Sequence, residues 1–358
     1  MDPDTEVDVD MSPYLIRYKS GRVRRLMGTS KVAAGTDAAT GVTSKDVVVD
    51  ATFGLAARLY IPSDALTTSG ARLPILVYFH GGAFSIHSAF SATHSRFLNA
   101  LVSASRAVAH PLPAAYDDAW AALRWAVSRT EEPWLSAHAD VARLFVAGDS
   151  AGANMAHQVT LRLGGLPGGA RIERIALLHP YFRGKELVPS EGTDPRSSDR
   201  QWAFVCAGRY GMDHPFVNPL AMTAAEWASL GCRRVLVAVA ELDTMSERGR
   251  RYVEALRGSA WAGEEAVLYV TQGEGHVFFL RNFKESDRAM QDMITAVASF
   301  LASSTAGGWL SPSVRSLGCP QLLMLSFRSS SSINEVNWSV FCLHFQASLS
   351  GGFMDTIT

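Results

Sequence analysis

The sequence predicts an α/β fold in which a mostly parallel central sheet carries helices on both faces. Apolar strand-like runs alternate with segments whose apolar residues recur about every 3.6 positions, the period of a helix. Such alternation is typical of parallel sheets, because parallel strands need crossover helices between them. With 358 residues, 47% of them hydrophobic, the chain is also long enough to bury one large core.

The predicted strands are short apolar runs bounded by turn residues. The first two form a pair of edge strands within the segment DVVVDATFGLAARLYIP. The later ones are nearly continuous apolar runs, which is typical of strands buried on both faces. They are, in order, LPILVYFHGG, RLFVAGDS, RIALLHPYF, RRVLVAVAELD and AVLYVTQGEGH.

The predicted helices lie between these strands and show apolar spacing near 3.6. They are SRFLNALVSAS, AAYDDAWAALRWAV, AGANMAHQVTLRL, MSERGRRYVEALRGS and SDRAMQDMITAVASFLASS. The alternation fails once, because only RAVA separates the first of these helices from the segment that starts the second. No full strand fits there, so we expect the fold to lack one internal strand near residue 109.

The last 54 residues, 305–358, differ from the rest of the chain. They contain four charged residues, a run of four serines and no sustained period of either kind. We therefore expect residues 1–304 to form the folded domain and residues 305–358 to be an atypical tail outside it. On this interpretation, truncation after Ser304 leaves activity and melting behaviour unchanged.

Composition excludes several classes of function. A net charge of −1 and 19% charged residues provide no basic surface for nucleic acid and no polybasic membrane signal. The four cysteines are widely spaced without a CxxC pair, which argues against a zinc site or a disulfide framework. The acidic amino terminus and the lack of a long apolar run predict a cytoplasmic protein that acts on a small molecule.

The segment GDSAG at 148–152 places Ser150 where an apolar strand meets a helix. A serine on such a sharp turn has a strained backbone, and its neighbours two residues away come close enough that side chains there would clash. The motif alone is weak, since a chain of this composition contains it by chance about once in five. Its position between a predicted strand and a predicted helix makes Ser150 a candidate nucleophile.

A serine nucleophile needs a base and a carboxylate that orients it. Asp243 and His276 each follow a later predicted strand, in the chain order Ser, Asp, His that α/β-hydrolases use. His157 lies within a predicted helix and His179 within a buried run, so we expect structural roles for both. Asp243 could instead cap the helix that follows it, and the other motifs favour the catalytic interpretation.

The segment FHGGAF supplies two glycines directly after a strand. Without side chains, Gly81 and Gly82 let a carbonyl oxygen approach their backbone amides. The amide of Ala151, at the start of the helix after Ser150, would point to the same oxygen. We therefore expect Gly81, Gly82 and Ala151 to form an oxyanion hole.

These motifs together resemble the plant carboxylesterases of the hormone-sensitive-lipase-like α/β-hydrolases. The resemblance covers about residues 12–303 and also includes HPLPAAYDDAWAALRWA, HPYF and GEGHVFF. It implies an α/β-hydrolase fold, the triad Ser150, Asp243 and His276, and a helical cap from about 1–45 and part of 182–230. It implies no cofactor, and we expect no metal.

We therefore expect a serine carboxylesterase that hydrolyses small acyl or aryl esters through an acyl-enzyme. We expect a small-molecule ester as its partner, with no nucleic acid and no membrane, and a monomer or weak homodimer. Gibberellin receptors share the fold without the triad histidine, so His276 argues against a hormone-binding role. A dehydratase similar to the hydroxyisoflavanone dehydratases remains an alternative.

The family normally has a strand and a YRLAPE-like turn immediately before HPLPAAYDD. In this chain Ala109 directly precedes His110, so about ten residues, one average strand with its turn, are missing. An inactive or mis-spliced product is therefore a third alternative, because an absent internal strand would leave its neighbours without ladder partners.

Overall fold

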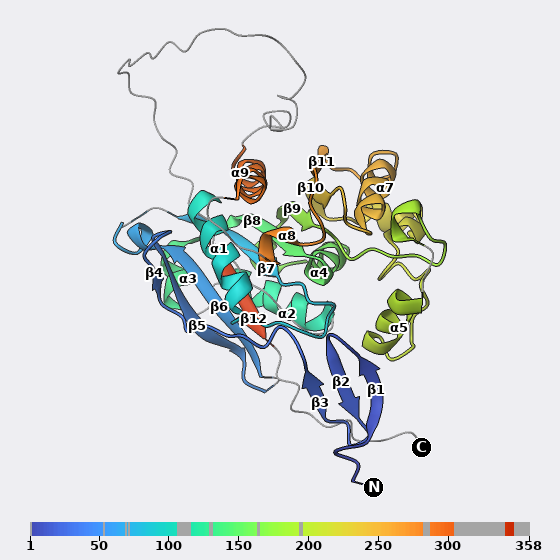
Figure 1. The fold of residues 1–358 in the computed structure, drawn as a ribbon. Coiled ribbons are helices and arrows are strands. Elements are labelled where there is room, and N and C mark those ends of the chain that lie inside the picture. Colours follow the sequence, from blue (N-terminus) through green and yellow to red (C-terminus); the bar gives the residue numbers. More distant parts are fainter. Residues whose placement is uncertain are drawn as a thin grey trace, which may run out of the picture.

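The structure of the protein is a computed structural model (Figure 1). It describes residues 2–303, with gaps, and the backbone of 341–346. The gaps are residues 53, 69, 71, 106–115, 129–131, 163–164, 193–195 and 282–286.

Nine strands form the central sheet in the order β11-β10-β9-β8-β7-β12-β6-β5-β4. Their bounds are β4 Thr36–Asp37, β5 Val42–Asp50, β6 Leu55–Pro62, β7 Leu73–Phe79, β8 Ala139–Asp149, β9 Ile172–Leu178, β10 Cys232–Ala240, β11 Glu265–Thr271 and β12 Phe341–Gln346. The five strands from β7 to β11 are parallel to one another, whereas β4, β5 and β6 pair antiparallel. The predicted α/β fold with a mostly parallel sheet is thus confirmed.

The helices include all five that the sequence predicts. Their bounds are α1 Ala92–Ser105, α2 Tyr116–Val127, α3 Pro133–His138, α4 Ala151–Thr160, α5 Arg196–Val205, α6 Ala224–Ala228, α7 Ser246–Arg257, α8 Phe278–Arg281 and α9 Arg288–Ala302. Helix α1 packs against α8 and α9, whereas α2 packs against α4. Together they cover a core in which every residue of β7 is buried, as its continuous apolar run predicts.

The amino-terminal segment forms a small antiparallel sheet rather than helices. Its strands are β1 Val7–Met11, β2 Leu15–Tyr18 and β3 Val23–Arg25. Polar residues interrupt the apolar pattern of these short strands, which is why the sequence did not reveal them. In Figure 1 this sheet lies beside α5, and the guanidinium of Arg17 stacks 5.3 Å from the ring centroid of Phe204.

The segment 341–346 forms β12 between β6 and β7. It pairs antiparallel with β6 and parallel with β7, and it is drawn in red in Figure 1. For these six residues the structure differs from our expectation that 305–358 lies outside the fold. The expected deletion at Ala109 and His110 lies outside the described residues.

Candidate active site

Ser150 stands on the sharp turn that joins β8 to α4. Its backbone has φ of 52° and ψ of −117°, a conformation that L-residues rarely adopt and that is therefore strained. The amide of Ser150 donates to the carbonyl of Leu178 at 2.9 Å, and its own carbonyl accepts from the amide of Tyr181 at 2.9 Å. These two bonds anchor the strained turn to the end of β9.

The two glycines that flank Ser150 are required by close backbone contacts. A Cβ at Gly148 would lie 2.6 Å from the carbonyl oxygen of Phe79. A Cβ at Gly152 would overlap that same carbonyl group outright. The steric reason for the G-x-S-x-G spacing therefore holds in this chain, and the obstacle is the carboxyl end of β7.

The structure brings the side chains of Ser150, His276 and Asp243 into one hydrogen-bonded chain. The Oγ of Ser150 lies 2.9 Å from Nε2 of His276, and Nδ1 of His276 lies 2.7 Å from Oδ2 of Asp243. Asp243 follows β10 and His276 follows β11, so all three lie beyond the carboxyl ends of parallel strands, where open α/β sheets build their sites. Ser150 and Asp243 are buried, and the His276 side chain is 23% exposed.

The electrostatics favour an ionised Asp243. Burial alone would raise the pKa of this carboxyl group, but the nearby His179 and hydrogen bonds from His276 and from the Met245 amide hold the pKa well below its usual range. The Met245 amide donates to Oδ1 at 2.9 Å, which leaves Oδ2 to His276. A fixed negative charge therefore faces Nδ1 of the imidazole.

His179 supports the loop that carries His276. It is fully buried, and its Nδ1 accepts a hydrogen bond from the Val277 amide at 3.1 Å. The same Nδ1 lies 3.5 Å from Asp243 Oδ2, too far for a good hydrogen bond. Burial lowers the pKa of His179, although Asp243 opposes this, so the ring is neutral and can accept. Val277 has φ of 46°, and the bond from His179 holds this unusual conformation.

The HGG loop is arranged differently from the expected oxyanion hole. The Gly81 amide donates to Oδ1 of the buried Asp149 at 3.0 Å, so it faces the carboxylate instead of open space. Among the hydrogen bonds of the described part of the chain, none comes from the amide of Gly82 or Ala83. Sequence reasoning missed Ala83, although its place after the two glycines in FHGGAF was a usable signal.

The carboxylate of Asp149 anchors the HGG loop by accepting the hydrogen bond from the Gly81 amide. Its Oδ1 also accepts from the Tyr78 hydroxyl at 2.9 Å and lies 3.2 Å from His94 Nε2. Burial would raise the pKa of Asp149, but His94, Tyr78 and the Gly81 amide together lower it to about 2. The residue preceding the serine is therefore an ionised, buried anchor for the loop.

An apolar aromatic cluster borders the HGG loop. The ring of Phe84 meets those of Tyr181 at 5.8 Å, Trp202 at 6.3 Å and Tyr116 at 6.4 Å between centroids. Trp202 comes from α5, and Phe84 directly follows the loop. Tyr181 and Trp202 are buried, whereas Phe84 is partly exposed.

His179, Asp243 and His276 form a group whose ligand atoms lie within 4.8 Å of one another, close enough to share a metal ion. However, Nδ1 of His179 accepts from Val277, and Nδ1 of His276 bonds Asp243. These nitrogens are already engaged, so the arrangement fits a hydrogen-bonded chain better than a metal centre.

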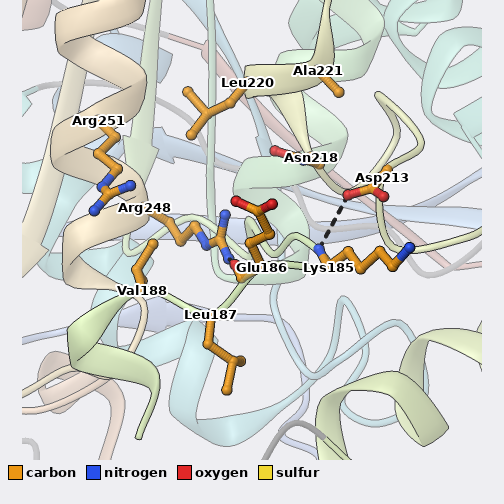
Figure 2. Close-up of a pocket in the computed structure, with 10 residues that line it drawn as sticks. All are labelled: Lys185, Glu186, Leu187, Val188, Asp213, Asn218, Leu220, Ala221, Arg248 and Arg251. Carbon is orange, nitrogen blue, oxygen red and sulfur yellow. Dashed lines mark hydrogen bonds between the residues drawn. The ribbon is translucent and has the colours of Figure 1, made fainter.

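A separate cavity of about 410 Å³ lies between α7 and the loop that precedes α5 (Figure 2). None of its ten lining residues belongs to the serine site. Arg248 in its wall bonds both carboxylate oxygens of Glu191, at 3.1 and 2.9 Å, and the carbonyl of Glu186. Because its main cation is already paired, we assign this cavity no role.

Comparison with known proteins places the chain in a family. Residues 76–280, more than half of the chain, match the α/β hydrolase fold family. The protein named "Probable carboxylesterase 13" of Arabidopsis thaliana is 39% identical over 326 aligned positions, which cover 83% of this chain and 98% of that protein. A 2-hydroxyisoflavanone dehydratase of Glycyrrhiza echinata is also 39% identical, covering 83% of this chain and 96% of that enzyme.

Other relatives and structures agree with this placement. An amyloplastic tuliposide A-converting enzyme of Tulipa gesneriana is 39% identical, covering 83% of this chain and 80% of that enzyme. A solved thermostable esterase of Pseudomonas putida shares the fold with a TM-score of 0.59 and 22% identity, over 75% of this chain and 84% of that one. In the described part of the chain, no helix has the length and apolar character needed to cross a membrane. The chain therefore belongs to the α/β hydrolase family, in the group that includes the plant carboxylesterases.

Proposed function

We propose that this protein is a serine carboxylesterase that hydrolyses small acyl or aryl esters through an acyl-enzyme. The observation that carries the proposal is the unbroken chain of hydrogen bonds from Ser150 through His276 to Asp243, at 2.9 and 2.7 Å. A nucleophile, a base and a group that orients the base are the parts that acyl transfer from an ester requires.

In the first step, Nε2 of His276 takes the proton of the Ser150 hydroxyl while Oγ attacks the ester carbonyl carbon. The carbonyl oxygen becomes an oxyanion, and its collapse expels the alcohol, which receives the proton from His276. Water then attacks the acyl-enzyme by the same route and releases the carboxylic acid. The buried anion of Asp243 stabilises the imidazolium that forms twice in this cycle.

For the oxyanion we propose the amides of Gly82, Ala83 and Ala151 as donors. This assignment replaces Gly81, whose amide is bonded to Asp149. Asp149 then acts on the reaction only by positioning the loop, because it pulls the first glycine inward and leaves the next two amides for substrate. Each lost donor of this kind typically costs about 10²- to 10³-fold in rate.

The aromatic cluster supports small acyl or aryl groups as the substrate class. Phe84 is partly exposed and is backed by the buried rings of Tyr181 and Trp202, so it offers an apolar face that can pack on a ring or a short alkyl chain. We propose that β1–β3 and α5 form a cap over this region, since Arg25 of β3 donates to the Ser85 carbonyl at 2.8 Å. The cytoplasmic location and the monomer or weak dimer stay predictions.

The test is hydrolysis of a p-nitrophenyl ester series from acetate to dodecanoate by the purified chain. We expect turnover to be highest for short acyl groups and to be absent in S150A. A fluorophosphonate probe should also add one label to Ser150, detected by peptide mass spectrometry. Labelling elsewhere, or turnover by S150A equal to that of the wild type, would exclude this nucleophile.

Dehydration is the second candidate, because a 2-hydroxyisoflavanone dehydratase is as similar to this chain as the carboxylesterase is. That reaction needs a base and an oxyanion-stabilising loop but no acyl-enzyme. The two functions differ in one measurement: S150A would lose ester hydrolysis but keep part of the conversion of 2-hydroxyisoflavanone to isoflavone. Conversion by the wild type with no hydrolysis of any ester would favour the dehydratase.

A further inference from the structure

β12 lies inside the central sheet although it comes from a segment far along the chain from both of its neighbours. The sheet order places β12 directly between β6 and β7, which have no pairing with each other. Without β12, the other described strands of the central sheet fall into two separate groups, β4-β5-β6 and β7 to β11. The segment 341–346 is thus the only described link between the antiparallel and the parallel halves of the sheet.

The direction of β12 matches that of a strand between α1 and α2. A strand that leaves β7 through a crossover helix returns parallel to β7. β12 is parallel to β7, with Phe341 opposite Ile75 and Leu343 opposite Val77. The sequence offers no strand at that place, since only ten residues, 106–115, separate α1 from α2. Residues 341–346 therefore provide a strand parallel to β7. The sequence predicts no such strand for the short connection between α1 and α2.

We propose that residues 341–346 act as a replacement strand, which docks into the slot between β6 and β7 and completes the sheet. Both β6 and β7 need a hydrogen-bonding partner on the edges that β12 occupies. Apart from Ala56, every residue of β6 is buried, as is every residue of β7, and buried N–H and C=O groups are costly to leave unpaired. The segment FCLHFQ is also rich in apolar residues, as buried strands are.

The comparison with relatives supports a shortened chain. The alignment to the Arabidopsis relative is 326 positions long, whereas 83% of this 358-residue chain is about 297 residues. That relative therefore has residues with no counterpart here. This agrees with the short connection between α1 and α2 that the sequence indicates.

The replacement strand lies next to the candidate site. β7 leads directly into His80 and the HGG loop, and β12 runs parallel to it. The carbonyl of Phe79, at the end of β7, also contacts the glycines that flank Ser150. Loss of β12 should therefore lower stability and ester hydrolysis together, although the pairing itself does not depend on the proposed function.

The direct test is hydrogen exchange of the full-length wild-type protein, read by mass spectrometry. We expect the amides of 341–346 to exchange as slowly as those of β6 and β7, at least 100-fold slower than in an unstructured peptide. Exchange at the unstructured rate, while β6 and β7 stay protected, would overturn the proposal. Light scattering on the same sample measures the oligomeric state. If 341–346 is protected only when the protein is a dimer, the strand between β6 and β7 comes from a second copy of the chain, and the proposal is overturned.

A matched pair of substitutions tests the consequence. Proline removes an N–H that an internal strand must donate, so L343P should prevent pairing. L323P makes the same change in the tail outside β12 and serves as the control. We expect L343P to lose at least tenfold in soluble yield or to unmask exchange in β6 and β7, with L323P unchanged. Equal behaviour of the two variants would contradict the proposal.

An insertion tests the replacement itself. A strand-forming segment with a turn, placed between Ala109 and His110, should take the slot and release 341–346. Truncation after Ser304 should then be tolerated in the inserted chain, whereas in the original chain it should sharply reduce soluble yield. If truncation damages both chains equally, β12 does not replace the missing strand.

Discussion

The catalytic edge and the seam of the sheet are built in different ways. The catalytic edge is our name for the candidate site residues Ser150, Asp243 and His276 at the ends of β8, β10 and β11, each on the turn of its own strand-to-helix unit. The seam is the set β6, β12 and β7, in which the middle strand comes from about 280 residues beyond its neighbour. One region is specified locally, and the other depends on a distant segment.

This difference indicates which changes in the sequence affect each of the two regions. The turn that carries each of these three side chains is encoded in its own segment of the sequence, and contacts from elsewhere in the fold, such as that of His179 with Val277, hold the turn in place. The seam is not encoded locally, because its middle strand, residues 341–346, pairs with β6 and β7 from far along the chain. The regions meet at the end of β7, where the Phe79 carbonyl lies against Gly148 and Gly152.

The largest expected effect separates chemistry from fold. S150A and H276A should each lower kcat/KM for a short ester by about 10³-fold or more, and the double variant should lose no more than either. Melting temperature and hydrogen exchange of the seam should stay as in the wild type. Losses that add in the double variant would show that Ser150 and His276 do not act as a unit, and a loosened seam would show that the two regions are not independent.

The next largest effect is expected at the contact between the two regions, where Gly152 lies against the Phe79 carbonyl. G152A would push a Cβ into the backbone of Phe79, so we expect about 3 kcal/mol less free energy of unfolding and a strong loss of activity. G165A is the matched control, because no atom lies within 4 Å of a Cβ built there. Urea unfolding measures both. A stable, active G152A protein would mean that the elbow and β7 are not in tight contact.

Asp149 should give a smaller effect that depends on pH. Its pKa in the folded protein, about 2, lies below the reference value of 3.8, so the ionised form stabilises the fold above pH 4. That contribution is lost as pH falls from about 4 towards 2. D149N should therefore be about 2 kcal/mol less stable at pH 7, with a smaller difference at pH 3. A difference that is the same at both pH values would contradict this origin.

The smallest effect concerns His179. H179L removes the acceptor for the Val277 amide and should lower kcat by about tenfold, because the His276 loop loses its anchor. H179N keeps an acceptor oxygen near the position of Nδ1 and should recover most of the rate. KM should change little in either variant. If the two variants lose equally, His179 serves packing alone.

The sequence predicted the parallel half of the fold because each strand there is a continuous apolar run followed by its own helix. It did not predict β1–β3, whose short strands mix apolar and charged residues. It also did not predict β12, because a strand of six residues without neighbours of known direction has no signature of its own. Pairing across such a distance is a property of the folded sheet.

The site was predicted more completely than the fold, and one detail required coordinates. Ser150, Asp243 and His276 follow from motif and chain order, and the structure joins them by hydrogen bonds. Which glycine amide faces outward depends on the backbone dihedral angles of the loop and on Asp149, which takes the Gly81 amide. Both groups are in the sequence, but their contact arises only when β7 and β8 pair side by side.

The pairing of β6 with β12 can form only after residues 341–346 have been synthesised. A ribosome that adds about 5–20 residues per second needs roughly 15 s to 1 min to pass from β6 to the segment that pairs with it. Throughout that interval the nascent chain exposes two apolar strand edges, which are the surfaces that aggregate and that chaperones bind. Completion of the sheet is thus a late event in synthesis, because it waits for residues 341–346.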